Sequence, residues 1–160
     1  MKELVGIAER VAAQLIARKQ TIAVAESSAG GLISASLLAV PGASAYYLGG
    51  AVVYTRDARQ VLMDISDDGM RGFRSSSEPY AQLLAEQMRS RFNCEWGLSE
   101  TGAAGPTGNR YGDAAGHSCM AVAGPAAEVM TLETGSSDRF ANMQVFAATA
   151  LKLLLRKLEG

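Results

Sequence analysis

A carboxylate and two hydroxyls stand together near the start of the chain, in the segment Glu26-Ser27-Ser28-Ala29-Gly30-Gly31. The segment follows Thr21–Ala25, a run of small and β-branched residues that predicts a buried strand, and apolar periodicity resumes at Leu32. Glycines there allow a positive φ, and the free N–H groups of a first helical turn can bind an anion or an oxyanion. The segment is therefore interpreted as a strand–loop–helix junction that presents a nucleophile beside an anion site, although such a junction can also serve only to reverse the chain.

Composition argues against several other kinds of site. The chain has 160 residues, a formal net charge of -1 and 15 lysines and arginines that are scattered rather than gathered in a run, so nothing indicates attraction to nucleic acid or to an anionic membrane. His117 is the only histidine, and Cys94 and Cys119 are the only cysteines. These are too few for most zinc, iron or Ser-His-Asp sites, and we expect structural thiols and small-molecule chemistry.

The first residues, Met1–Lys19, mix charged and apolar side chains, which is typical of neither a signal peptide nor a membrane span. The spacing of their apolar residues predicts an amphipathic helix over Lys2–Arg18. The length fits one domain over residues 1–160. A single-domain cytoplasmic protein is therefore expected.

Periodicity and turn residues predict the remaining elements. Strands are expected at Thr21–Ala25, Ala51–Tyr54, Trp96–Ser99, His117–Ala123 and Glu128–Leu132, the last two as an antiparallel hairpin. Further helices are expected at Leu32–Leu38, at Asp57–Met63, from a start signalled by Ser75 to about Phe92, and, capped by Ser137, at Asp138–Leu158. The alternation of strands and helices predicts a three-layer α/β/α sandwich with a mixed, mostly parallel sheet.

Ligand sites in such sheets lie beyond the carboxyl ends of the strands. The loop at residues 26–31, the segment Tyr54–Arg59 and the glycine-rich stretch of residues 100–112 should therefore converge on one pocket. The glycines of that stretch are compatible with a flexible cover over a ligand and equally with a plain long connection.

The order of five short motifs resembles the CinA C-terminal domain family over about residues 4–157. The motifs are Glu26–Gly31, Gly49–Tyr54 followed by Asp57-Ala58-Arg59, Ser77-Glu78, Thr101–Pro106, and Gly135 with Asp138-Arg139. The family includes nicotinamide mononucleotide deamidases, amidohydrolases that convert the ring carboxamide into a carboxylate and release ammonia during pyridine nucleotide recycling. The resemblance implies the same fold, no metal or organic cofactor, a small nucleotide as the partner rather than nucleic acid or membrane, and room for a homo-oligomer.

The resemblance also implies roles for single residues. Ser27 corresponds to the serine nucleophile, Tyr54 to a tyrosine that assists it, and Arg59 to the position of the lysine that acts as general base. Residues expected to bind the substrate or its oxyanion are Glu26, Ser28, Gly30, Gly31, Thr101, Gly102, Gly105 and, at the nucleotide phosphate, Arg139.

Several positions depart from the family pattern. Arg59 replaces the lysine, and a guanidinium with a pKa above about 12 stays protonated and cannot accept the proton of a serine. Ser28-Ala29 stands where Cys-Thr is usual, Met143 replaces a second arginine, and Glu100 replaces an apolar or small residue.

Two functions follow from these departures and both stay open at this point. One is an amidase in which Glu100, Glu26 or Tyr54 accepts the proton. The other is a nucleotide-binding or structural relative that has kept the pocket and lost the chemistry.

Overall fold

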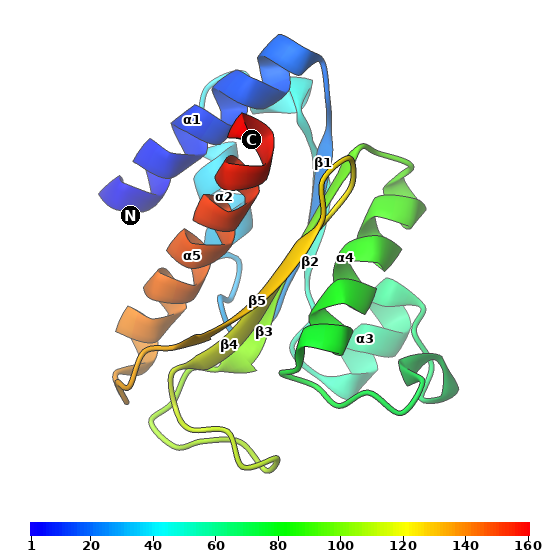
Figure 1. Ribbon diagram of the computed structural model, residues 1–160, viewed down its shortest axis with the longest axis vertical. Coiled ribbons are helices and arrows are strands. Elements are labelled where there is room, and N and C mark those ends of the chain that lie inside the picture. Colours follow the sequence, from blue (N-terminus) through cyan, green and yellow to red (C-terminus); the bar gives the residue numbers. More distant parts are fainter.

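The computed structural model describes residues 1–160 and places a twisted sheet between two layers of helices (Figure 1). The elements, in chain order, are α1 (Lys2–Arg18), β1 (Ile22–Glu26), α2 (Leu32–Leu38), η1 (Ala43–Ala45), β2 (Tyr47–Val52), α3 (Arg56–Met63), η2 (Asp68–Met70), α4 (Glu78–Phe92), β3 (Trp96–Ala103), β4 (His117–Ala123), β5 (Glu128–Glu133) and α5 (Arg139–Glu159). The strand order is β2-β1-β3-β4-β5. β4 alone runs in the direction opposite to the other four strands, so the predicted sandwich with a mixed, mostly parallel sheet is confirmed.

Helices cover both faces of the sheet. α1, α2 and α5 lie on one face, and α3 and α4 lie on the other (Figure 1). The larger cluster of buried side chains includes Leu15, Trp96 and Phe146 and fills the first interface, while Met63 and Leu84 belong to a cluster on the second. No helix is both long enough and apolar enough to cross a membrane.

The interior strand β1 is buried along its whole length, which explains why small and β-branched residues occupy it. Close packing on the α4 side depends on Gly97 in β3, because a Cβ atom there would lie 2.1 Å from the carbonyl oxygen of Ala85 in α4. The sheet thus holds the carboxyl ends of β1, β2 and β3 in fixed positions at one edge of the molecule.

Two strands differ from the prediction. β2 begins at Tyr47 and ends at Val52, so Tyr54 lies beyond the strand that was expected to contain it. Its two glycines obscured the strand, because glycine weakens the sequence signal of an edge strand. β3 continues to Ala103, where it pairs with His117, so Thr101 and Gly102 belong to a strand and not to a loop.

Two helix starts also differ. Ser77 and not Ser75 caps α4, accepting a hydrogen bond from the Tyr80 amide, and Asp138 and not Ser137 caps α5 by accepting one from the Ala141 amide. Ser77 lies two residues after the predicted cap, and Asp138 lies one residue after the predicted cap. A serine-rich sequence offers several equivalent caps, and the direction of the incoming chain selects one of them.

Candidate active site

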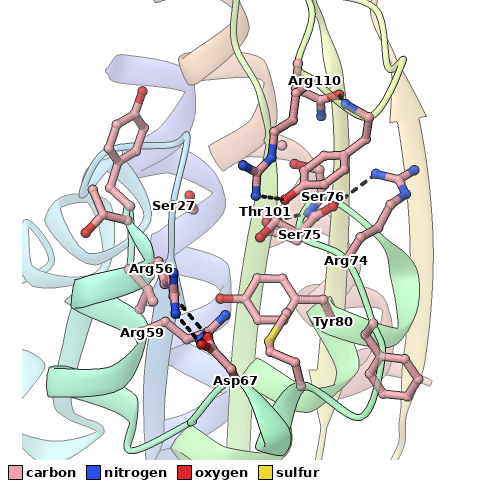
Figure 2. Close-up of a pocket in the computed structure, with 18 residues that line it drawn as sticks. Ser27, Arg56, Arg59, Asp67, Arg74, Ser75, Ser76, Tyr80, Thr101 and Arg110 are labelled. Carbon is pink, nitrogen blue, oxygen red and sulfur yellow. Dashed lines mark hydrogen bonds and ion pairs between the residues drawn. The ribbon is translucent and has the colours of Figure 1, made fainter.

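A cavity of about 720 Å³ opens where the carboxyl ends of β1, β2 and β3 meet. Ser27, Tyr54, Arg59, Thr101 and Gly102 all line it, which confirms the predicted convergence of these segments on one pocket. Figure 2 shows Ser27 among the residues that line this cavity, with Arg59 and Asp67 at the bottom of the view, Arg74 at the right and Arg110 at the top.

Ser27 directly follows β1 and is half-buried. Its backbone amide donates to Oε1 of Glu100 at 3.1 Å, and its carbonyl accepts from the amide of Gly30 at 3.0 Å. The hydroxyl makes no hydrogen bond within the protein. The main chain of Ser27 is therefore fixed while its Oγ remains free to meet a ligand.

Glu26 is fully buried and accepts hydrogen bonds from backbone N–H groups at the start of α2. Its carboxylate accepts hydrogen bonds from the amides of Gly31 at 2.8 Å, Ile33 at 3.1 Å and Ser34 at 2.9 Å. Burial raises the pKa of this carboxyl, and the three amide bonds oppose that rise. The prediction of a free anion site at this helix start is therefore wrong, because the carboxylate of Glu26 occupies the amides, including that of Gly31.

Glu100 is the second buried carboxylate behind the loop. Its Oε1 accepts from the amides of Ser27 and, at 2.7 Å, Ala29; its Oε2 accepts from the Ser118 hydroxyl at 2.7 Å and from the Ser28 hydroxyl. Burial raises the pKa of Glu100 against the effect of these bonds.

These contacts assign the two carboxylates to the support of the loop. Neither Glu26 nor Glu100 lines the cavity, and the Ser28 hydroxyl points to Glu100. Backbone polar groups that can face a ligand come instead from β3, whose pairing with β1 ends at Ser99. The edge of β3 at Thr101 and Gly102 therefore faces the cavity without a neighbouring strand.

Arg59 in α3 is 7% exposed and is held at both ends of its guanidinium. Its Nε donates to the carbonyl of Ile65 at 3.0 Å, and its Nη2 lies 2.5 Å from Oδ1 of Asp67. Asp67 also pairs with Arg56, and the hydrogen bonds from Arg56 and Arg59 lower the pKa of its carboxyl. Position 59, which corresponds to the general-base lysine of the family that the sequence resembles, thus carries a cation in a salt bridge.

Tyr54 and Arg139 meet at a smaller, adjoining cavity of about 210 Å³. Arg139 donates from Nη2 to the Tyr54 hydroxyl at 3.1 Å and from Nη1 to the Gly105 carbonyl at 2.5 Å. Ser28 and Gly105 line only this second cavity, whereas Tyr54 and Gly102 line both. The structure therefore divides the predicted site residues between two adjoining cavities, and Glu26, Gly30 and Gly31 line neither of them.

Sequence reasoning missed a cationic wall. Four arginines line the main cavity, Arg56, Arg59, Arg74 and Arg110, with Asp67 as the only acidic lining residue. Basic residues that are scattered along the sequence are therefore gathered here by the fold. The Arg110-Tyr111 pair inside the glycine-rich stretch was the local signal that could have pointed to this wall.

The family model of the CinA C-terminal domain matches residues 5–158. The chain belongs to this family. A CinA-like protein of Desulforapulum autotrophicum is 31% identical over 158 residues, covering 98% of this chain and 37% of that protein. A CinA-like protein of Synechococcus sp. is 42% identical over 105 residues, covering 66% of this chain and 25% of that protein.

Solved structures of the CinA superfamily have the same fold. The protein from Klebsiella pneumoniae 700603 superimposes with a TM-score of 0.90 at 25% identity over 98% of each chain. That from Enterobacter cloacae does so with a TM-score of 0.88 at 26% identity, covering 97% of this chain and 92% of that one. The chain spans 22% to 37% of the length of eight curated CinA-like relatives that it matches.

Proposed function

We propose that this CinA-family domain binds a pyridine mononucleotide with its ring in the main cavity and its phosphate at Arg139 in the adjoining cavity, and that it hydrolyses the ring carboxamide slowly, with Ser27 as the nucleophile. The observation that carries the proposal is the free Ser27 hydroxyl in the main cavity, next to an adjoining cavity in which Arg139 keeps unused N–H donors. A guanidinium with free donors can bind a nucleotide phosphate, and a serine in the neighbouring cavity can attack a carbonyl of the same ligand.

The chemistry assigns a step to each group. Oγ of Ser27 attacks the carboxamide carbon, and the β3 backbone at Thr101 and Gly102 stabilises the resulting oxyanion. The proton that Ser27 gives up passes to the nitrogen, the carbon–nitrogen bond breaks and ammonia leaves, and water then cleaves the Ser27 ester to give the carboxylate and free Ser27. Tyr54 assists at the nucleophile, and Arg139, which keeps unused N–H donors beyond Tyr54 and Gly105, binds the phosphate.

Proton transfer limits the rate in this proposal. A serine needs a neighbouring base, and help of this kind contributes roughly a hundred- to ten-thousand-fold to a rate. Arg59 cannot supply it, and both buried carboxylates are committed to the loop. The bond between Arg59 and Asp67 supports a second candidate function, which is nucleotide binding without turnover.

Ammonia release from nicotinamide mononucleotide, measured with calorimetric binding of the same compound, separates the two functions. For the amidase we expect slow ammonia release that Ser27→Ala abolishes while binding persists. The control Ser90→Ala removes an exposed hydroxyl on α4, away from the cavity, and should leave both unchanged. Binding without ammonia release supports the second function, and the absence of binding refutes both.

A further inference from the structure

Arg110 differs from the other three arginines of the main cavity. Arg56 and Arg59 pair with Asp67, and Arg74 pairs with Asp113. Arg110 forms no salt bridge; its Nη2 donates to the Tyr111 hydroxyl at 3.0 Å, and its guanidinium carbon lies 5.1 Å from the centre of that ring. It is therefore the one guanidinium of the cavity wall that pairs with no carboxylate of the protein.

The segment that carries Arg110 is held in place by its neighbours. Oδ1 of Asn109 accepts hydrogen bonds from the amides of Tyr111 at 3.0 Å and Asp113 at 3.1 Å. The guanidinium of Arg74 donates two hydrogen bonds to the carboxylate of Asp113, at 2.7 Å and 3.1 Å. The Arg74 guanidinium also lies 5.2 Å from the centre of the Tyr111 ring. A guanidinium presented from a fastened segment loses less conformational entropy on binding than one on a free loop.

The position of Arg110 separates it from the phosphate site assigned to Arg139. Arg110 lines the main cavity and not the adjoining one, whereas Arg139 lines only the adjoining one. In Figure 2, Arg110 lies at the top of the view, whereas Arg59 and Asp67 lie at the bottom. A mononucleotide carries a single phosphate, so a ligand bound through Arg139 leaves Arg110 without an anion.

We infer that Arg110, backed by Tyr111 and Arg74, forms a second anion subsite, and that the cavity takes a pyridine nucleotide with a second anionic group, namely a dinucleotide with a diphosphate. This inference rests on the proposed function for the pyridine end of the ligand. A guanidinium suits this task because its planar fork bonds two phosphate oxygens at once.

Calorimetric titration in phosphate-free buffer at fixed ionic strength tests the inference with three probes, nicotinamide mononucleotide, NAD⁺ and inorganic pyrophosphate. We expect NAD⁺ to bind at least about tenfold more tightly than the mononucleotide, which corresponds to one added charged contact. Arg110→Ala should remove that gain and leave the affinity for the mononucleotide unchanged. Arg139→Ala should weaken both nucleotides.

Two further variants keep the result interpretable. Arg71→Ala removes an equal charge from an exposed position outside both cavities and should change nothing. Arg110→Lys keeps the positive charge but lacks the planar guanidinium, and its NAD⁺ affinity should lie between those of Arg110→Ala and the original chain. Arg110 is exposed, and unchanged thermal unfolding of its variants will show that the fold is intact.

Three outcomes decide the question. Equal weakening of both nucleotides by Arg110→Ala would assign Arg110 to the single phosphate and overturn the second subsite, and so would NAD⁺ binding no tighter than the mononucleotide. Pyrophosphate binding that depends on Arg110, without binding of either pyridine compound, would reject the proposed function while supporting the subsite.

Discussion

Nη2 of Arg59 lies 2.5 Å from Oδ1 of Asp67, and both side chains line the cavity that Ser27 also lines. A carboxylate at this distance favours the charged form of any basic side chain at position 59. A lysine at position 59 would lie beside the same carboxylate. Asp67 would therefore keep that lysine protonated and prevent it from acting as a general base.

Arg59→Lys alone should therefore raise ammonia release only slightly, and Arg59→Lys with Asp67→Asn should raise it further. Removal of the Asp67 charge lets burial lower the pKa of the new lysine. A functional base contributes on the order of a hundredfold or more. The measurement is ammonia release from nicotinamide mononucleotide at neutral pH.

Two controls accompany that series. Asp67→Asn alone should not increase turnover, because the guanidinium of Arg59 still cannot accept a proton. Ser27→Ala in the double variant should abolish the gain. Equal rates for the single and double lysine variants would show that Asp67 does not suppress the base.

Glu100→Gln should change how stability depends on pH. Burial raises the folded-state pKa of Glu100 above its ordinary 4.5, so the folded chain holds this proton at pH values where the unfolded chain has lost it. The contribution of Glu100 to the free energy of unfolding is therefore fully present below about pH 4.5, and it is lost as the pH rises through the raised pKa. The free energy of unfolding of the original chain should fall relative to Glu100→Gln over that window, by at most about 1.4 kcal/mol per pH unit.

Urea unfolding of both proteins between about pH 4 and pH 8 measures this difference. Glu26 has a pKa shifted in the same direction, but it is present in both proteins and cancels in the comparison. A difference that stays constant with pH would mean that Glu100 has the same pKa in the folded and unfolded chains.

His117 should produce a second pH dependence. Burial lowers its pKa, but the bonds to the Ser76 carbonyl and to Glu133, with the charges of Asp113 and Glu133, outweigh burial and raise the pKa above 6.5. The stability gained from the charged ring is therefore present below pH 6.5 and lost as pH rises through the raised pKa. His117→Gln should remove this step from the unfolding profile, and a step that survives the substitution would assign it to another group.

Two glycines should respond to alanine in opposite ways. Gly97→Ala places a Cβ atom 2.1 Å from the Ala85 carbonyl, so α4 must move away from β3, and we expect a loss of about 3 kcal/mol or more. Gly6 is exposed in α1 with no atom within 4 Å of an added Cβ, and Gly6→Ala should gain about 0.5 to 1 kcal/mol. Thermal and urea unfolding measure both, and a tolerated Gly97→Ala would contradict the packing of α4 on β3.

The sequence by itself determined the features that depend on neighbouring residues. Apolar spacing predicted α1 with its observed bounds, Lys2–Arg18, and the hairpin of β4 and β5, because helix and strand periodicities are local. The order of its motifs was sufficient to identify the CinA family, and strand alternation placed Ser27, Tyr54 and Arg59 at one edge of the sheet.

Only the tertiary structure decided which groups around Ser27 remain free. Glu100 bonds the Ser27 amide across 73 positions of sequence, and Arg59 meets Asp67 because an intervening turn brings that carboxylate back to α3. Burial and hydrogen-bond partners arise from the pairing of strands and the packing of helices, which no local pattern specifies. For the same physical reason, arginines that are distant in the sequence form one cationic wall, and Arg110 alone among them lacks a carboxylate.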